Sequence, residues 1–157
     1  MFIIFDTETT GLPKNYKAPI TNTDNWPRLV QLAWQVHGKA GELLDVKNYI
    51  VKPDGFTIPY NVEKIHGIST AIATKHGKPL AFVLKAFLKD LEKCQFAVGH
   101  NVGFDNNIIR CELYRTSLHD PLENKPSLDT QMLATAFCAL PGGRGGGFKW
   151  PKLEELH

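Results

Sequence analysis

Two acidic side chains, one residue apart, follow the first apolar run of the chain. Residues 2–5 (Phe-Ile-Ile-Phe) favour a short buried strand, and Asp6 and Glu8 come directly after it. Because side chains alternate between the faces of a strand, both carboxylates should project the same way at its carboxyl end. Two anions that close repel each other unless a proton or a cation lies between them, and a divalent ion suits their oxygens. A strand that ends in a charged turn would give the same pair, but the hydroxyl run and glycine turn that follow favour a metal site.

A third acid lies in the middle of the chain, in the string Gly-His-Asn-Val-Gly-Phe-Asp at residues 99–105. Here Asn101 can cap a helix that follows a short strand, which puts Asp105 in the first turns of that helix. Ligand sites in open α/β sheets lie at the carboxyl ends of strands, so Asp105 could join Asp6 and Glu8. Alternatively, Asp105 only complements the helix dipole. We interpret His100 as a structural residue that ties the strand end to the helix.

The remaining pattern describes the elements that must position these acids. Three strands joined by short turns predict an antiparallel meander, and later strands alternate with helices. This order predicts an α/β domain over residues 1–157, with a mixed sheet covered by helices on both faces. The expected strands are 2–5, 28–37, 44–51, 96–99 and a strand end or cap at 127–130, and the expected helices are 61–66, 69–75, 79–91, 102–115 and 132–140.

Composition limits the class of protein without naming a function. The 157 residues suit one domain, and a net charge of only +2 does not by itself indicate a nucleic-acid-binding protein. Three widely spaced cysteines, Cys94, Cys111 and Cys138, predict reduced thiols in a cytoplasmic protein rather than disulfides or a zinc site. No stretch is apolar enough for a membrane span or a signal peptide.

Four strings, taken together in chain order, resemble the DEDD 3′–5′ exonuclease superfamily. They are Phe-Asp-Thr-Glu-Thr-Thr-Gly-Leu at 5–12, residues 62–69, Gly-His-Asn-x-x-Phe-Asp at 99–105, and residues 128–134. Within that superfamily they are most similar to the proofreading epsilon subunit of bacterial DNA polymerase III. The resemblance implies an RNase H-like fold with a five-stranded mixed sheet flanked by helices.

The resemblance also implies a chemistry and a substrate. Two Mg²⁺ or Mn²⁺ ions would be bridged by Asp6, with Glu8 on one ion and Asp105 in the same cluster, partly through water. The substrate would be the 3′ end of single-stranded or frayed DNA, and the partner would be the polymerase III alpha subunit. The implied substrate contacts are Thr7, Thr9, Thr10, Leu12, His66, Asn101 and Phe104.

One part of the family pattern is missing. The family needs a fourth carboxylate shortly after a histidine or tyrosine that activates water, yet no aspartate follows Asp129. Asp129 could be an outer-shell acid or a helix cap. Residues 150–157 look like a helix start that is cut short, so His157 is not taken as the catalytic histidine. We therefore expect this chain to be weakly active or inactive, by truncation or by natural loss.

Other interpretations stay open. The glycine-rich stretch 141–147 could be a flexible connector, or part of a mobile flap in which Arg144, Lys149 and Trp150 touch nucleic acid. A phosphatase of the haloacid dehalogenase class would want an aspartate at position 8, where this chain has Glu8. A non-catalytic polymerase- or nucleic-acid-binding subunit and an exoribonuclease remain alternatives, and the oligomeric state is undetermined.

Overall fold

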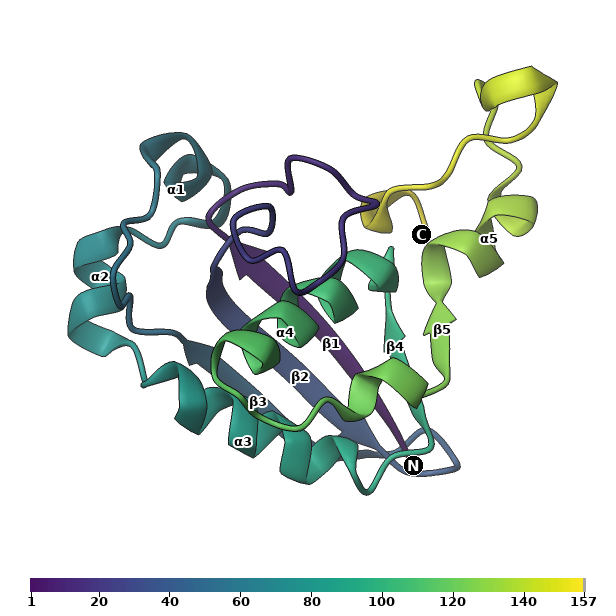
Figure 1. Ribbon diagram of the computed structural model, residues 1–157. Coiled ribbons are helices and arrows are strands. Elements are labelled where there is room, and N and C mark those ends of the chain that lie inside the picture. Colours follow the sequence, from purple (N-terminus) through teal and green to yellow (C-terminus); the bar gives the residue numbers. More distant parts are fainter. Residues whose placement is uncertain (157) are drawn as a thin grey trace.

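The computed structural model describes residues 1–156 and contains one five-stranded mixed sheet (Figure 1). The strand order is β3-β2-β1-β4-β5; β2 is antiparallel to both β1 and β3, whereas β4 is parallel to β1 and β5. This arrangement confirms the predicted fold class. The strands are β1 (Phe2–Thr9), β2 (Leu29–His37), β3 (Leu43–Ile50), β4 (Phe96–Gly99) and β5 (Ser127–Asp129).

The helices follow the predicted order closely. The apolar stripe of residues 80–91 forms α3, and Pro79 is its N-cap residue. Asp129 caps α5 by accepting hydrogen bonds from the backbone N–H groups of Gln131 and Met132, which is the helix-cap role considered for it. The helices are α1 (Tyr60–His66), α2 (Thr70–His76), α3 (Leu80–Leu91), α4 (Val102–Arg115) and α5 (Thr130–Cys138).

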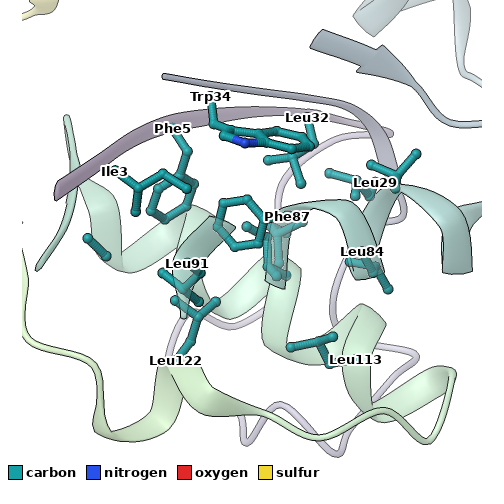
Figure 2. Packing of buried hydrophobic residues seen from close by; sticks show 14 of the residues in the cluster. Ile3, Phe5, Leu29, Leu32, Trp34, Leu84, Phe87, Leu91, Leu113 and Leu122 are labelled. Atoms are coloured by element: carbon teal, nitrogen blue, oxygen red, sulfur yellow. The ribbon is translucent and has the colours of Figure 1, made fainter. Parts of the chain in front are cut away.

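The hydrophobic core lies between the sheet and the helices α3 and α4, which occupy the same side of it (Figure 1). Phe87 of α3 points toward β1 and β2, where its ring meets Phe5 edge-on at 5.2 Å and Trp34 at 5.5 Å between centroids (Figure 2). Such edge-to-face pairs add to the stabilisation from burying the rings themselves. The core thus fixes β1, which carries the first two acids, against the helix layer.

Helices were expected to cover both faces of the sheet, but the second face is largely open. Ile4, Asp6, Glu8, Gln35 and Val46 point to this side, which we call the open face. Ile4 is 37% exposed and Val46 is 54% exposed, so residues 1–156 leave much of this face uncovered. Helix periodicity predicts that a segment buries one side, but it does not say which face of the sheet that side will meet.

The cap of α4 also differs from the prediction. Asn101 occupies the N-cap position in the left-handed conformation, with φ 61°, and its side chain makes no capping hydrogen bond. Instead, its backbone N–H donates to Oδ1 of Asp129 at 3.0 Å. The left-handed backbone places the asparagine where the chain must turn sharply from β4 into α4.

The chain beyond α5 forms only short 3₁₀ turns in the described residues. Arg144–Gly146 lies within the glycine-rich stretch, and Leu153–Glu155 stands where a longer helix was expected to begin. His157 lies outside the described residues. No helix within residues 1–156 is long and apolar enough to cross a membrane.

Candidate active site

Asp6 and Glu8 lie side by side on the open face near the carboxyl end of β1. The strand continues to Thr9, beyond the predicted end at residue 5, because β2 pairs with it along its whole length: Asp6 opposes Ala33 and Glu8 opposes Gln31. The expected common direction of the two carboxylates is therefore confirmed, but inside the strand rather than after it. Strand pairing makes their separation rigid.

Asp105 approaches from the other side of β1. It lies in the first turn of α4 and is 3% exposed. Its Oδ1 accepts the backbone N–H of Thr7 at 3.0 Å and the Thr7 hydroxyl at 2.5 Å. Thr7 thus ties the mid-chain helix to the strand segment between the two other acids.

The three carboxyl groups share a strained electrostatic environment. Burial raises the pKa of Asp105 to about 7, and the nearby charge of Asp6 adds to this effect against the hydrogen bonds from Thr7. Partial desolvation also raises the pKa of Asp6, although the residue as a whole is exposed. Desolvation first and the charge of Asp6 second raise the pKa of Glu8. A cation at this edge would relieve the repulsion among the three groups.

The arrangement fits a divalent ion in a specific way. Within residues 1–156, no three Asp, Glu, His or Cys side chains gather closely enough to hold one ion directly. Asp6 and Glu8 fit an ion such as Mg²⁺, which keeps several waters and takes substrate phosphate oxygens. Asp105, with Oδ1 engaged by Thr7, fits a contact through water. The structure therefore does not bring the three predicted ligands around a single point.

The predicted nucleotide-contacting residues on the turn after β1 differ in whether their side chains are already engaged in hydrogen bonds. The Thr9 hydroxyl donates to the backbone oxygen of Gly11 at 2.6 Å, and the Thr10 hydroxyl accepts the backbone N–H of Arg28 at 2.9 Å. Leu12 is 72% exposed, so its side chain is available for packing against a ligand. The two threonines shape the turn that presents Leu12.

His66 ends α1 beside the same turn. Its Nδ1 accepts the backbone N–H of Ile68 at 3.1 Å, while Nε2 is buried without a hydrogen-bond partner among the described residues. Burial lowers the pKa of His66, partly offset by the nearby Thr9 backbone. Because Gly67 follows in the left-handed conformation, α1 stops at the histidine and leaves its ring near β1.

Phe104 and Asn101, both on the α4 side, complete the predicted set. Phe104 packs against the core, half-buried, and Asn101 is exposed at the turn that precedes the helix. Among the predicted residues, Thr7 contacts Asp105 directly and the Thr9 backbone lies near His66, whereas Asn101 and Phe104 lie at the start of α4.

Two features of the site were not predicted from the sequence. His100 hydrogen-bonds through Nε2 to the Pro151 backbone oxygen at 2.9 Å, so the chain near residue 151 is joined to the β4 end of the site. A hollow of about 500 Å³ on the open face extends from Asp6 and His100 to Ile4, Val46 and Leu153. His100 was expected to tie the strand end to the helix that follows, but its bonds join β4 to Thr130 of α5 and to Pro151, and such distant contacts leave no periodic signal in the sequence.

Comparison with known proteins agrees with this geometry. The RNase T family model, described as exonuclease, matches residues 3–149. The chain belongs to this exonuclease family. Membership confirms the resemblance to the DEDD superfamily that the motifs indicated. No curated protein sequence gave a significant match.

Solved structures of exonuclease I share the fold. Escherichia coli exonuclease I in complex with a dA16 oligonucleotide matches with a TM-score of 0.74 and 20% identity, covering 99% of this chain and 34% of that one. A product-bound exonuclease I matches with a TM-score of 0.74 and 22% identity, covering 99% and 37%. A complex described as ExoI/SSB-Ct matches with a TM-score of 0.73 and 20% identity, covering 99% and 35%. The chain thus spans about a third of the length of these structures.

Proposed function

We propose that this chain is a 3′–5′ exonuclease domain that removes nucleotides from the 3′ end of single-stranded or frayed DNA with the help of Mg²⁺ or Mn²⁺. The observation that carries the proposal is the pair of hydrogen bonds from Thr7 to Asp105, which attaches the third acid to the strand segment between Asp6 and Glu8 near the carboxyl end of β1. Burial raises the pKa of all three acids, the charge of Asp6 adds to this effect at Glu8 and Asp105, and such carboxylates favour a bound cation. Family membership supports phosphodiester hydrolysis as the reaction.

Each residue then has a defined task. The carboxylates of Asp6 and Glu8 would hold the cations from the open face, and Asp105, anchored on Thr7, would contact them through water. When bound, a pair of divalent ions stabilises the attacking and leaving oxygens of an in-line displacement at phosphorus. Leu12 packs against the terminal base, a contact that tolerates any sequence. His66 and Phe104 border the pocket for that nucleotide.

DNA is the proposed substrate for two reasons. Exonuclease I, which shares the fold, is described in complex with DNA oligonucleotides. The motifs most resemble the epsilon subunit, which supports a proofreading role and a polymerase alpha subunit as partner. An exoribonuclease would need recognition of the 2′-hydroxyl, and digestion of matched DNA and RNA oligonucleotides separates these substrates.

A direct assay tests the activity. A 5′-labelled single-stranded DNA, incubated with Mg²⁺ or Mn²⁺, should shorten stepwise from the 3′ end. Asp6→Asn should abolish the ladder. Internal cleavage, or full activity in Asp6→Asn, would contradict the proposal.

A second candidate is a non-catalytic subunit that binds DNA ends. In that case the wild-type chain would bind a 3′ end in the presence of divalent ions, yet give no products at any enzyme concentration. Stepwise products that disappear in Asp6→Asn would exclude this alternative.

A further inference from the structure

A second carboxylate of α4 is buried on the same side of the helix as Asp105. Glu112 follows Asp105 by seven residues, which is about two helical turns, and it is 0% exposed. Asp105 holds Thr7 of β1, whereas Glu112 accepts the backbone N–H of Leu29 in β2 at 2.9 Å. The helix is therefore attached to two neighbouring strands through two carboxylates.

Two arginines meet at the same oxygen of Glu112. Oε1 accepts Nε of Arg28 at 3.0 Å and lies 3.0 Å from Nη1 of Arg115. Arg115 in turn donates through Nη2 to the backbone oxygens of Thr23 and Trp26 at 2.5 and 2.7 Å. The end of the loop that precedes β2 is thus held to α4 by side chains rather than by strand pairing.

This cluster is connected to the turn that presents the nucleotide-contacting residues. The backbone oxygen of Arg28 accepts the N–H of Thr10 at 2.9 Å, and the Arg28 N–H donates to the Thr10 hydroxyl at 2.9 Å. Leu29 pairs with Thr9 immediately after a register shift between Glu8 and Thr9. Two bonds to Arg28 and the Leu29 pairing therefore determine the position of the turn relative to β2.

Burying a carboxylate completely in order to attach a helix costs free energy. Ionised groups lose their hydration on burial, and an apolar residue of similar volume often stabilises a fold as well or better. Here Oε2 of Glu112 has no hydrogen-bond partner among the described residues, so the desolvation is only partly compensated. Its alignment, by contrast, is specific, because one oxygen sets the position of Arg28, Leu29 and Arg115 together.

We propose that Glu112 is a positioning residue for substrate recognition: through Arg28 it holds the turn Thr9–Leu12 at a fixed place relative to Asp105. This inference rests on the proposed function, since it assigns that turn to the 3′-terminal nucleotide. It goes beyond it by placing the control of end recognition on the far half of α4. Loss of Glu112 should loosen the turn and weaken binding of a DNA end, without removing any group that touches the DNA.

End-specific binding tests the role without relying on turnover. Fluorescence anisotropy, with Ca²⁺ as the divalent ion, compares a linear single-stranded oligonucleotide with a circular one of the same sequence, which has no 3′ end. Wild type should prefer the linear form. Glu112→Gln, which keeps an acceptor but removes the charge, should weaken linear binding by about tenfold, equivalent to about 1.4 kcal/mol, and leave circular binding unchanged.

Asp90→Asn is the matched control. Asp90 is also a buried carboxylate with cationic partners, but it accepts from Trp34, Lys47 and Lys93, away from the turn. It should lower the melting temperature while preserving the preference for the linear oligonucleotide. A merely structural role for Glu112 would make the two variants behave alike.

A double-mutant cycle identifies the route of the effect. Thr10→Val removes the hydroxyl that accepts the Arg28 N–H, so the double variant with Glu112→Gln should bind the linear oligonucleotide no more weakly than the worse single variant. If Glu112→Gln does not fold, as judged by circular dichroism, Arg28→Gln takes its place, since it removes only one of the three donors.

The binding measurements distinguish a failure of the proposed function from a failure of the role assigned to Glu112. A wild-type chain that binds linear and circular DNA equally overturns the proposed function, and this inference with it. If the wild type prefers the linear form and Glu112→Gln keeps this preference, only the inference about Glu112 is overturned. The same holds if the effects of Glu112→Gln and Thr10→Val on linear binding are fully additive.

Discussion

At the scale of single residues, the pKa values of two buried aspartates are shifted in opposite directions for clear physical reasons. Burial would raise the pKa of Asp90, but hydrogen bonds from Lys47, Lys93 and Trp34 outweigh it and lower the pKa to about 2. Asp105 is buried without a cationic partner among residues 1–156, and its pKa rises to about 7. Asp90 is thus held as an anion by cationic side chains, whereas Asp105 binds a proton more readily than an ordinary aspartate does.

This contrast predicts how stability depends on pH in the absence of metal. The pKa of Asp105 in the folded chain lies above the ordinary value of 3.8, so protonation favours folding. Stability from this group is complete below about pH 4 and should decline as pH rises toward 7, by at most about 1.4 kcal/mol per pH unit. Asp105→Asn, which cannot ionise, should remove this part of the decline in urea unfolding with EDTA at pH 4.5, 6 and 8.

Asp90→Asn provides the opposite case in the same experiment. Because the pKa of Asp90 is lowered, its contribution is fully present above pH 4 and is lost only as pH falls toward 2. The variant should therefore be less stable by a similar amount at all three pH values. An Asp105→Asn profile parallel to that of wild type would show that this carboxyl group is not the one titrating.

At the scale of elements, the sequence predicted the helices and strands that form because of their own hydrophobic pattern. The apolar stripe of α3 and the alternation of β2 could be recognised directly, and both formed as expected. By contrast, the extension of β1 through Thr9 could not be predicted, because Asp6 and Glu8 are held in the strand by pairing with β2 rather than by their own preferences.

Long-range contacts explain the remaining differences. Asn101 was a reasonable cap from its residue type, but the turn into α4 required a left-handed residue and Asp129 took over the bond to its backbone N–H. Glu112 could not be distinguished from an exposed helical acid, because only the fold brings Arg28 and Leu29 to it. The common direction of Asp6 and Glu8 was predictable because their spacing on one strand is local. The hydrogen bonds of Asp105 to Thr7 and of Glu112 to Arg28 were not, because they join distant parts of the chain.

The end of α1 gives a test at this scale. Gly67 adopts φ 77°, which a residue with a Cβ atom adopts only with strain, although the space around it is open. Gly67→Ala should destabilise the fold by about 1 kcal/mol and disturb the His66 ring, seen as reduced melting temperature and a shifted histidine resonance. Gly103→Ala, in α4 with equally open space, should be neutral or slightly stabilising. Equal effects of both substitutions would contradict the backbone argument.

At the scale of the whole molecule, cation binding should be visible as stability. An ion that binds only the folded chain stabilises it by about 2.7 kcal/mol at a hundred times its dissociation constant. Mg²⁺ or Mn²⁺ should therefore raise the melting temperature at pH 8, where Asp105 is ionised. Asp6→Asn should lose most of this increase, whereas Glu42→Gln, an exposed acid of the hairpin turn, should keep it. A shift that survives in Asp6→Asn would place the ion elsewhere.

The bond between Thr7 and Asp105 joins these scales. β4 pairs with β1 only at Phe2, Ile3 and Ile4, so beyond this point the backbone of β1 has no neighbour strand on that side. The N–H of Thr7 is satisfied by a carboxylate instead of by a carbonyl group. The nuclear magnetic resonance signal of this amide proton should consequently follow the charge on the Asp105 carboxylate. It would report whether Asp105 is protonated, ionised or close to a bound cation.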